Sequence, residues 1–125
     1  QMNTYFVLDN LETLRKTGRL TGVKALVAST LSIKPVMGAN AGEIIQLGQA
    51  IGIKKALAKM AETVVKEAIH PEEKSLMITH CNCLERAESV KKMILEKINV
   101  KKVLIMDTRG VSSMYANDGG VIVTL

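Results

Sequence analysis

The chain has 125 residues and a formal net charge of +5, and 47% of its residues are hydrophobic. A chain of this length predicts one domain with a buried core, and the hydrophobic fraction excludes a disordered protein. Only two tyrosines and one phenylalanine are aromatic. We therefore expect an aliphatic core in which the seven methionines fill gaps, and this favours an aliphatic ligand over a nucleotide.

The charged residues and the cysteines indicate which partners and which cellular compartment to expect. Lysine and arginine occur in scattered pairs such as Arg15-Lys16 and Lys101-Lys102, which is typical of a solvated surface. Because no basic-aromatic motif accompanies them, we expect no nucleic-acid partner. No apolar run approaches the ~20 residues that a membrane-spanning helix needs. Cys81 and Cys83 are too close in sequence for an ordinary disulfide, which predicts reduced thiols and a cytoplasmic location.

The first part of the chain predicts one strand followed by two helices. Residues 4–8 are β-branched and aromatic, as is typical of a strand. A short helix should begin at Asp9 or Asn10 and end at Gly18, because glycine is common just after a helix. Apolar residues between 20 and 31 recur on one stripe, which predicts a second helix.

The middle of the chain predicts a hairpin and a long helix. Residues 33–37 and 43–47 favour strands, and a loop of about five residues, GANAG, joins them. Pro35 should lie where the ladder needs no hydrogen bond. Apolar residues from 53 to 69 recur at helical spacing, and Pro71 ends this helix.

The last part predicts a strand over 75–79, a helix over 82–98, and strands over 100–106 and 121–125 after a glycine-rich loop. The order of elements is then β-α-α-β-β-α-β-α-β-β. Hairpins in the middle and at the end of the chain predict antiparallel pairing. We therefore expect one α+β domain over residues 1–125. It should be a two-layer sandwich, with helices packed on a mostly antiparallel six-stranded sheet.

The motif HCNC, residues 80–83, is the strongest candidate for a metal site. Histidine and cysteine bind zinc, but a structural site needs four ligands, and His70 is the only other histidine. A C-x-C pair also lacks the C-x-x-C spacing of redox motifs. We therefore expect no metal, and we interpret the motif as a strand end that runs into a helix with the cysteines packed in the turn.

No arrangement of residues indicates catalysis. Ser29 and Ser32 have helical spacing, but no base follows at a recognisable spacing. Neither a carboxylate pair nor a phosphate-binding glycine motif stands out. We therefore expect neither an enzyme nor a cofactor.

Two segments stay open between a structural and a binding role. Arg19 lies between two glycines, so it is either a surface residue after a helix or an arginine that binds an anion through two hydrogen bonds. The run GVSSMYANDGG, residues 110–120, is either a long loop with a tight turn or a source of hydroxyl and backbone N–H groups for a ligand.

Several runs, in order, resemble the C-terminal domain of the DegV family of bacterial lipid-binding proteins. They are YFVLDNLETLRKTGRL, LSIKPVM, AGEIIQLGQAIGIKKAL, MITHCNCLERAE and YANDGGVIV, and they cover nearly the whole chain. The first run is the most specific. The family typically shows a strand, a short L-x-x-L helix and Gly-Gly-Arg-Ile, where this chain has Thr17-Gly18-Arg19-Leu20.

The resemblance implies a complete protein with two domains. An N-terminal α/β domain, absent from this chain, would supply the hydroxyl groups that hold a fatty-acid carboxylate. The present domain would enclose the acyl chain between sheet and helices, and Arg19 matches the family's arginine near the head group. In some bacteria such proteins present the fatty acid to a fatty acid kinase, so the binding protein is not the catalyst.

Two departures from the family concern the head group. Family members commonly end in His-Thr-Gly-Pro-Gly, whose histidine lies near the carboxylate, where this chain has Tyr115-Ala116-Asn117-Asp118-Gly119. A tyrosine hydroxyl can donate a hydrogen bond to a carboxylate but carries no positive charge. The family often has an arginine where this chain has Ile51.

The resemblance therefore predicts a domain that binds a long-chain fatty acid, with the carboxylate near the missing N-terminal domain. The alternative is a lipid-free domain for protein–protein interaction or regulation, which a dry and fully packed core would favour. The residues expected at the site are the head-group set Arg19, Tyr115, Asn117 and Gly119, and the acyl-chain set Leu26, Ile33, Ile45, Met77 and Ile105.

Overall fold

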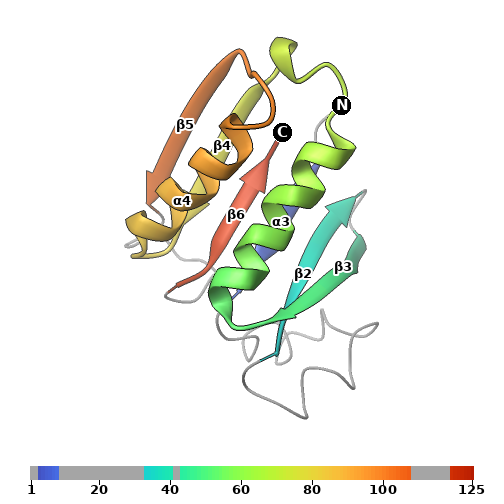
Figure 1. Cartoon of the computed structure of the whole chain (residues 1–125), viewed down its shortest axis with the longest axis vertical. Coiled ribbons are helices and arrows are strands. Elements are labelled where there is room, and N and C mark those ends of the chain that lie inside the picture. The colour runs from blue at the N-terminus through green and yellow to red at the C-terminus, as the bar shows by residue number, and fades with distance from the viewer. Residues whose placement is uncertain (1–2, 9–32, 41–42, 108–118) are drawn as a thin grey trace.

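The computed structural model describes residues 3–8, 33–40, 43–107 and 119–125, in which two α-helices lie on a six-stranded sheet (Figure 1). The two helices expected between residues 10 and 31 lie outside these ranges. The strands are β1 (Thr4–Val7), β2 (Ile33–Asn40), β3 (Glu43–Ile51), β4 (Ser75–His80), β5 (Lys102–Asp107) and β6 (Val121–Thr124). The helices are α3 (Ile53–Glu67), α4 (Leu84–Leu95) and a short 3₁₀-helix, η1 (Pro71–Glu73).

The strands are ordered β3-β2-β1-β6-β4-β5, and every neighbouring pair is antiparallel except β4 and β5. The predicted α+β sandwich is thus confirmed. The predicted hairpin at the end of the chain is wrong, because β6 lies between β1 and β4 rather than beside β5. The connection through α4 returns the chain to the end of the sheet where β4 begins, so that β5 runs parallel to β4. As a central strand, β6 pairs with β1 on one side and with β4 on the other, and Val121 is opposite both Val7 and His80.

The hairpin of β2 and β3 is confirmed, but its strands are longer than predicted. Pairing extends from Ile33 opposite Ile51 to Asn40 opposite Glu43. The register shifts after Val36, so Leu47 is an extra residue in β3, as in a β-bulge. Pro35 pairs with Gln49 and has no partner on β1, as expected for a residue that cannot donate to a second ladder.

The two long helices bury one stripe each against the same face of the sheet (Figure 1). Gly52 precedes α3 with φ of 87°, a backbone conformation that favours glycine. The buried residues of α3 and α4 are Ala56, Leu57, Met60, Ala61 and Val64, and Ala87, Val90 and Ile94. None of the described helices is long and apolar enough to cross a membrane.

The main core lies between these helices and the sheet, on what we call the helix-covered face. Its strand residues are all at most 4% exposed. Because side chains alternate along a strand, each strand also presents residues to the opposite side, which we call the second face. The strand residues of the main core are Tyr5, Val7, Val36, Leu76, Ile78, Val121 and Val123.

Candidate functional site

A smaller apolar cluster lies on the second face of the sheet. It includes Phe6 and Leu8, which alternate with Tyr5 and Val7 of the main core. The sheet is therefore apolar on both sides in this region. The buried members of the cluster are Phe6, Leu8, Met37 and Cys81, and Ala39, Ile44 and Ile122 pack against them.

Two of the predicted acyl-chain residues belong to the second face. Met77 lies between Leu76 and Ile78, which are both core residues on the helix-covered face, so its side chain points away from the helices. Ile33 shares the alternation of Met37, a buried member of the second cluster. Both predicted side chains are half-buried.

The other described acyl-chain residues belong to the helix-covered face. Ile105 packs against the main core. Ile45 follows Ile44, which packs against the second cluster, so Ile45 points to the helix side, where it is 44% exposed. The structure therefore does not bring the predicted lining residues together on one surface. Leu26 lies outside the described residues.

The HCNC motif forms the turn between β4 and α4, as predicted. β4 ends at His80, which is only 4% exposed, and α4 begins at Leu84. The Nδ1 atom of His80 accepts a hydrogen bond from the Cys83 N–H at 3.1 Å. Asn82 has a positive φ of 57°, which asparagine tolerates, and its N–H donates to Asp107 Oδ1 at 3.3 Å. These contacts fix the turn at the end of β4 and β5.

This turn also holds the glycine pair that precedes β6, and we call the set Cys81, Cys83, Arg86, Gly119 and Gly120 the Gly119 corner. The Gly119 N–H donates to the Cys81 carbonyl at 2.9 Å, and the Cys81 N–H donates to the Gly120 carbonyl at 3.1 Å. The Cys83 thiol donates to the Gly120 carbonyl at 3.4 Å. The Arg86 Nη1 group donates to the Gly119 carbonyl at 2.8 Å.

The contacts of Gly119 change what the sequence suggested for it. Its φ of 94° explains why a glycine stands there. Its N–H and its carbonyl are both bonded within the protein, so the residue fixes the backbone next to the predicted head-group segment. Sequence reasoning missed Arg86. The feature that could have pointed to Arg86 is its positive charge in the first turn of α4, because the helix dipole makes a cation unfavourable there.

Burial raises the pKa of the Cys83 thiol above its ordinary value, although the neighbouring Cys81 backbone and the Arg86 guanidinium oppose the shift. The thiol therefore stays protonated near neutral pH, and it acts as a hydrogen-bond donor rather than as a nucleophile. Neither Cys81 nor Cys83 forms a disulfide within the described residues. The corner thus provides structure and donors but no nucleophile–base pair among its residues.

One group in the described part of the chain brings three potential metal ligands together. His70, Glu72 and Glu73 lie around η1, all exposed, and His70 Nδ1 is 3.6 Å from Glu72 Oε2. Exposed acidic groups of this kind are common without an ion. The group does not include the HCNC motif.

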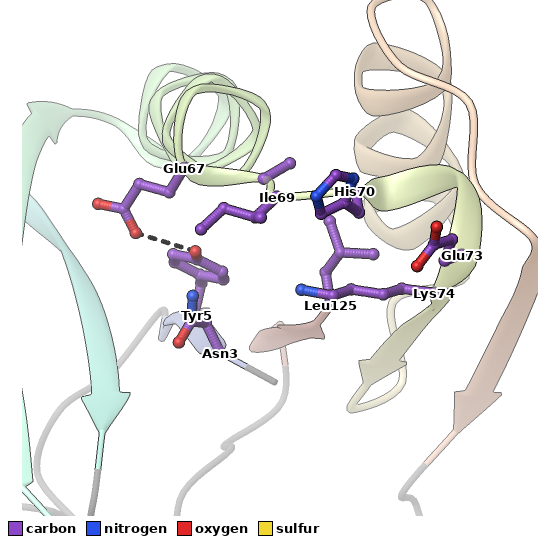
Figure 2. A pocket seen from close by; sticks show the side chains of 9 residues that line it. Asn3, Tyr5, Glu67, Ile69, His70, Glu73, Lys74 and Leu125 are labelled. Carbon is purple, nitrogen blue, oxygen red and sulfur yellow. Dashed lines mark hydrogen bonds between the residues drawn. The ribbon is translucent and has the colours of Figure 1, made fainter. Parts of the chain in front are cut away.

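A pocket of about 500 Å³ lies at the end of the sheet opposite the Gly119 corner (Figure 2). Its walls come from the start of β1, the ends of α3 and β6, and residues on both sides of η1. Figure 2 shows the Tyr5 hydroxyl facing Glu67, to whose Oε1 it donates a hydrogen bond of 2.9 Å. Burial, together with this carboxylate, raises the pKa of Tyr5 to about 12. From the sequence Tyr5 was only a strand residue, because its partner is 62 positions away.

A model of the DegV family, described as uncharacterised proteins, matches residues 1–124. The chain belongs to the DegV family. A DegV domain-containing protein of Clostridium perfringens is 39% identical over 102 residues, which are 81% of this chain and 35% of that protein. The predicted family is thereby confirmed.

Solved DegV structures share the fold described above. One from Ruminococcus gnavus, described with vaccenic acid, has 51% sequence identity and a TM-score of 0.91, and the match covers 99% of this chain and 44% of that one. One from Eubacterium eligens, loaded with heptadecanoic acid, has 27% identity and a TM-score of 0.81, with 98% and 44% covered. The Streptococcus pneumoniae Fatty Acid Kinase (Fak) B3 protein, loaded with linoleic acid, has 25% identity and a TM-score of 0.81, with 99% and 44% covered.

The chain thus spans less than half the length of the DegV proteins it matches. Of the predicted head-group residues, Gly119 alone lies in the described ranges. Arg19, Tyr115 and Asn117 lie outside them, and their contact with a carboxylate stays a prediction.

Proposed function

We propose that this chain is the acyl-chain-binding domain of a DegV-type protein that carries a long-chain fatty acid. The likeness to the Ruminococcus gnavus protein, at 51% identity over nearly the whole chain, supports a common ligand class. The Eubacterium eligens and Streptococcus pneumoniae proteins, both loaded with fatty acids, support it further. In this proposal the chain binds and presents its ligand and does not catalyse a reaction.

The second face of the sheet is the surface we assign to the acyl chain, and it is the observation that carries the proposal. At β4 the helix-covered face is filled, because Leu76 and Ile78 are fully buried under the helices. On the second face Met77 is half-buried, and Leu104 and Met106 are 38% and 48% exposed. A row of flexible apolar side chains beside a buried apolar cluster is a surface that an alkyl chain can cover.

The alkyl chain and the carboxylate of a fatty acid have different energetic requirements for binding. Burying about 14 methylenes at about 0.8 kcal/mol each gives ample gross affinity for the alkyl part. The carboxylate, in contrast, must find hydrogen bonds or a positive charge when it leaves water. We therefore assign the alkyl part to the second face and the carboxylate to the predicted residues Arg19, Tyr115 and Asn117.

The whole protein would complete the carboxylate site. Because the chain spans 44% of the matched Ruminococcus gnavus chain, we propose that it is the C-terminal domain of a longer protein. An N-terminal domain of that protein would supply the main carboxylate ligands, and a fatty acid kinase would receive the bound ligand. The absence of a disulfide between Cys81 and Cys83 fits a reducing compartment, so we propose a cytoplasmic location.

Native mass spectrometry of the full-length protein tests the proposed ligand class. We expect a co-purified fatty acid, or one equivalent of added palmitate or oleate per protein molecule. If neither is found, the proposal is wrong and the lipid-free interaction domain takes its place.

A pair of methionine substitutions tests the assignment to the second face. Met77→Gln places an amide where the alkyl chain should lie, and we expect it to weaken oleate binding about fivefold. Met93→Gln is the matched control, because Met93 of α4 is also half-buried but packs against the main core, away from the second face. Equal loss of affinity in both variants would contradict the assignment.

A further inference from the structure

The Gly119 corner holds its glycine pair in two different ways. The backbone hydrogen bonds between Cys81 and the two glycines extend the antiparallel pairing of β4 and β6, and they need no particular side chain. The bonds from Arg86 and Cys83 are different, because they are made by side chains of α4 and of the turn before it. Both side chains are half-buried, and both end on carbonyl oxygens of the glycine pair.

We propose that Arg86 and Cys83 are positioning residues for the carboxylate of the bound fatty acid. This inference rests on the proposed function. Gly119 belongs to the predicted head-group set, and its carbonyl is held at 2.8 Å by a charged donor. Hydrogen bonds from a guanidinium are roughly twice as strong as those between neutral groups, so Arg86 sets the orientation of this peptide group.

The position of Arg86 in α4 argues for such a role beyond helix packing. Ala87, Val90 and Ile94 already anchor α4 to the sheet through fully buried side chains. A positive charge in the first turn of a helix is unfavourable with respect to the helix dipole. The guanidinium of Arg86 nevertheless reaches a residue 33 positions away, and the bond to the Gly119 carbonyl is one of its contacts. Small displacements of a binding group cost affinity steeply, so a fixed Gly119 peptide matters most for a directional, charged ligand group.

The test compares two ligands that differ only at the head group, oleate and oleyl alcohol, on the full-length protein. We expect Arg86→Gln to lower the preference for oleate over the alcohol about fivefold, while the affinity for the alcohol stays the same. Arg86→Lys should restore part of the preference, because lysine can also donate a charged hydrogen bond. Lys92→Gln is the matched control, since it removes an exposed positive charge six residues further along α4 and should leave the preference unchanged.

The outcomes separate this inference from the proposed function. If the wild-type protein binds neither ligand, the proposed function is wrong and the inference is overturned with it. If the wild-type protein prefers oleate and Arg86→Gln keeps that preference, or weakens both ligands equally, only the inference is overturned. If Arg86→Gln does not fold, Cys83→Ala and Cys83→Ser decide. The serine variant retains a donor for the Gly120 carbonyl and should keep the preference that the alanine variant loses.

Discussion

The two faces of the sheet are built from the same strands, but their side chains are buried to different extents. On the helix-covered face, Leu76 and Ile78 of β4 are completely buried under α3 and α4. On the second face, the intervening Met77 is half-buried, and Leu104 and Met106 of the neighbouring strand are exposed. Adjacent residues of one strand therefore differ in burial, because Leu76 packs under the helices and Met77 points to the second face.

The largest effect we expect comes from comparing two neighbours on β4. Leu76→Ala should lower the free energy of unfolding by about 3 kcal/mol, because it leaves a cavity in a core that cannot collapse easily. Met77→Ala should cost only about 1 kcal/mol, because its side chain is half-buried to begin with. Urea denaturation of both variants measures the difference. Similar losses in the two variants would mean that the two faces are equally important for stability.

A second pair of substitutions extends the comparison to two glycines with positive φ. Gly52→Ala and Gly119→Ala should each cost about 1–2 kcal/mol, since both residues have φ near 90°. A Cβ at Gly52 meets no atom within 4 Å, so the cost there is backbone strain alone. We expect only Gly119→Ala to reduce the preference for oleate over oleyl alcohol as well. A matching loss of preference in Gly52→Ala would show that strain anywhere in the domain is enough.

The smallest effect concerns Tyr5, at the far end of the helix-covered face. Its pKa is raised from 10.0 to about 12, so the folded state retains the hydroxyl proton more tightly than the unfolded state. The stability from this group is therefore complete below pH 10 and is lost as the pH rises from 10 to 12. Tyr5→Phe should cost about 1 kcal/mol at neutral pH, through loss of the bond to Glu67.

The measurement for Tyr5 is the difference in unfolding free energy between wild type and Tyr5→Phe as a function of pH. Other groups titrate in the same range in both proteins and cancel in the difference. We expect the difference to be constant below pH 10 and to shrink between pH 10 and 12. A difference that does not change with pH would show that the Tyr5–Glu67 bond has no part in stability.

Much of the fold could be predicted because it depends on local signals. The hairpin of β2 and β3, the helix from Ile53 and the turn at HCNC all follow from periodicity, proline and glycine within a few residues. The place of β6 could not be predicted in this way. Its run VIVTL indicated a strand, but nothing near it in sequence shows that its neighbours are β1 and β4.

The residues of the candidate site also differ in whether the sequence could predict them. The resemblance identified the family and pointed to Gly119. The Arg86–Gly119 and Tyr5–Glu67 hydrogen bonds, in contrast, join residues that are 33 and 62 positions apart in the sequence. The assignment of Ile45 and Met77 to opposite faces depends equally on the bulge and register of strands that are distant in sequence.

By itself the sequence determined an aliphatic α+β domain, most of its strands and helices, and its family, because these depend on short-range patterns of side chains. Only the tertiary structure decided which strand residues lie under the helices and which lie on the second face, and which side chains hold the glycine pair before β6. The physical reason is that strand pairing and side-chain hydrogen bonds are chosen among segments brought together by folding, and burial of the main core selects that arrangement.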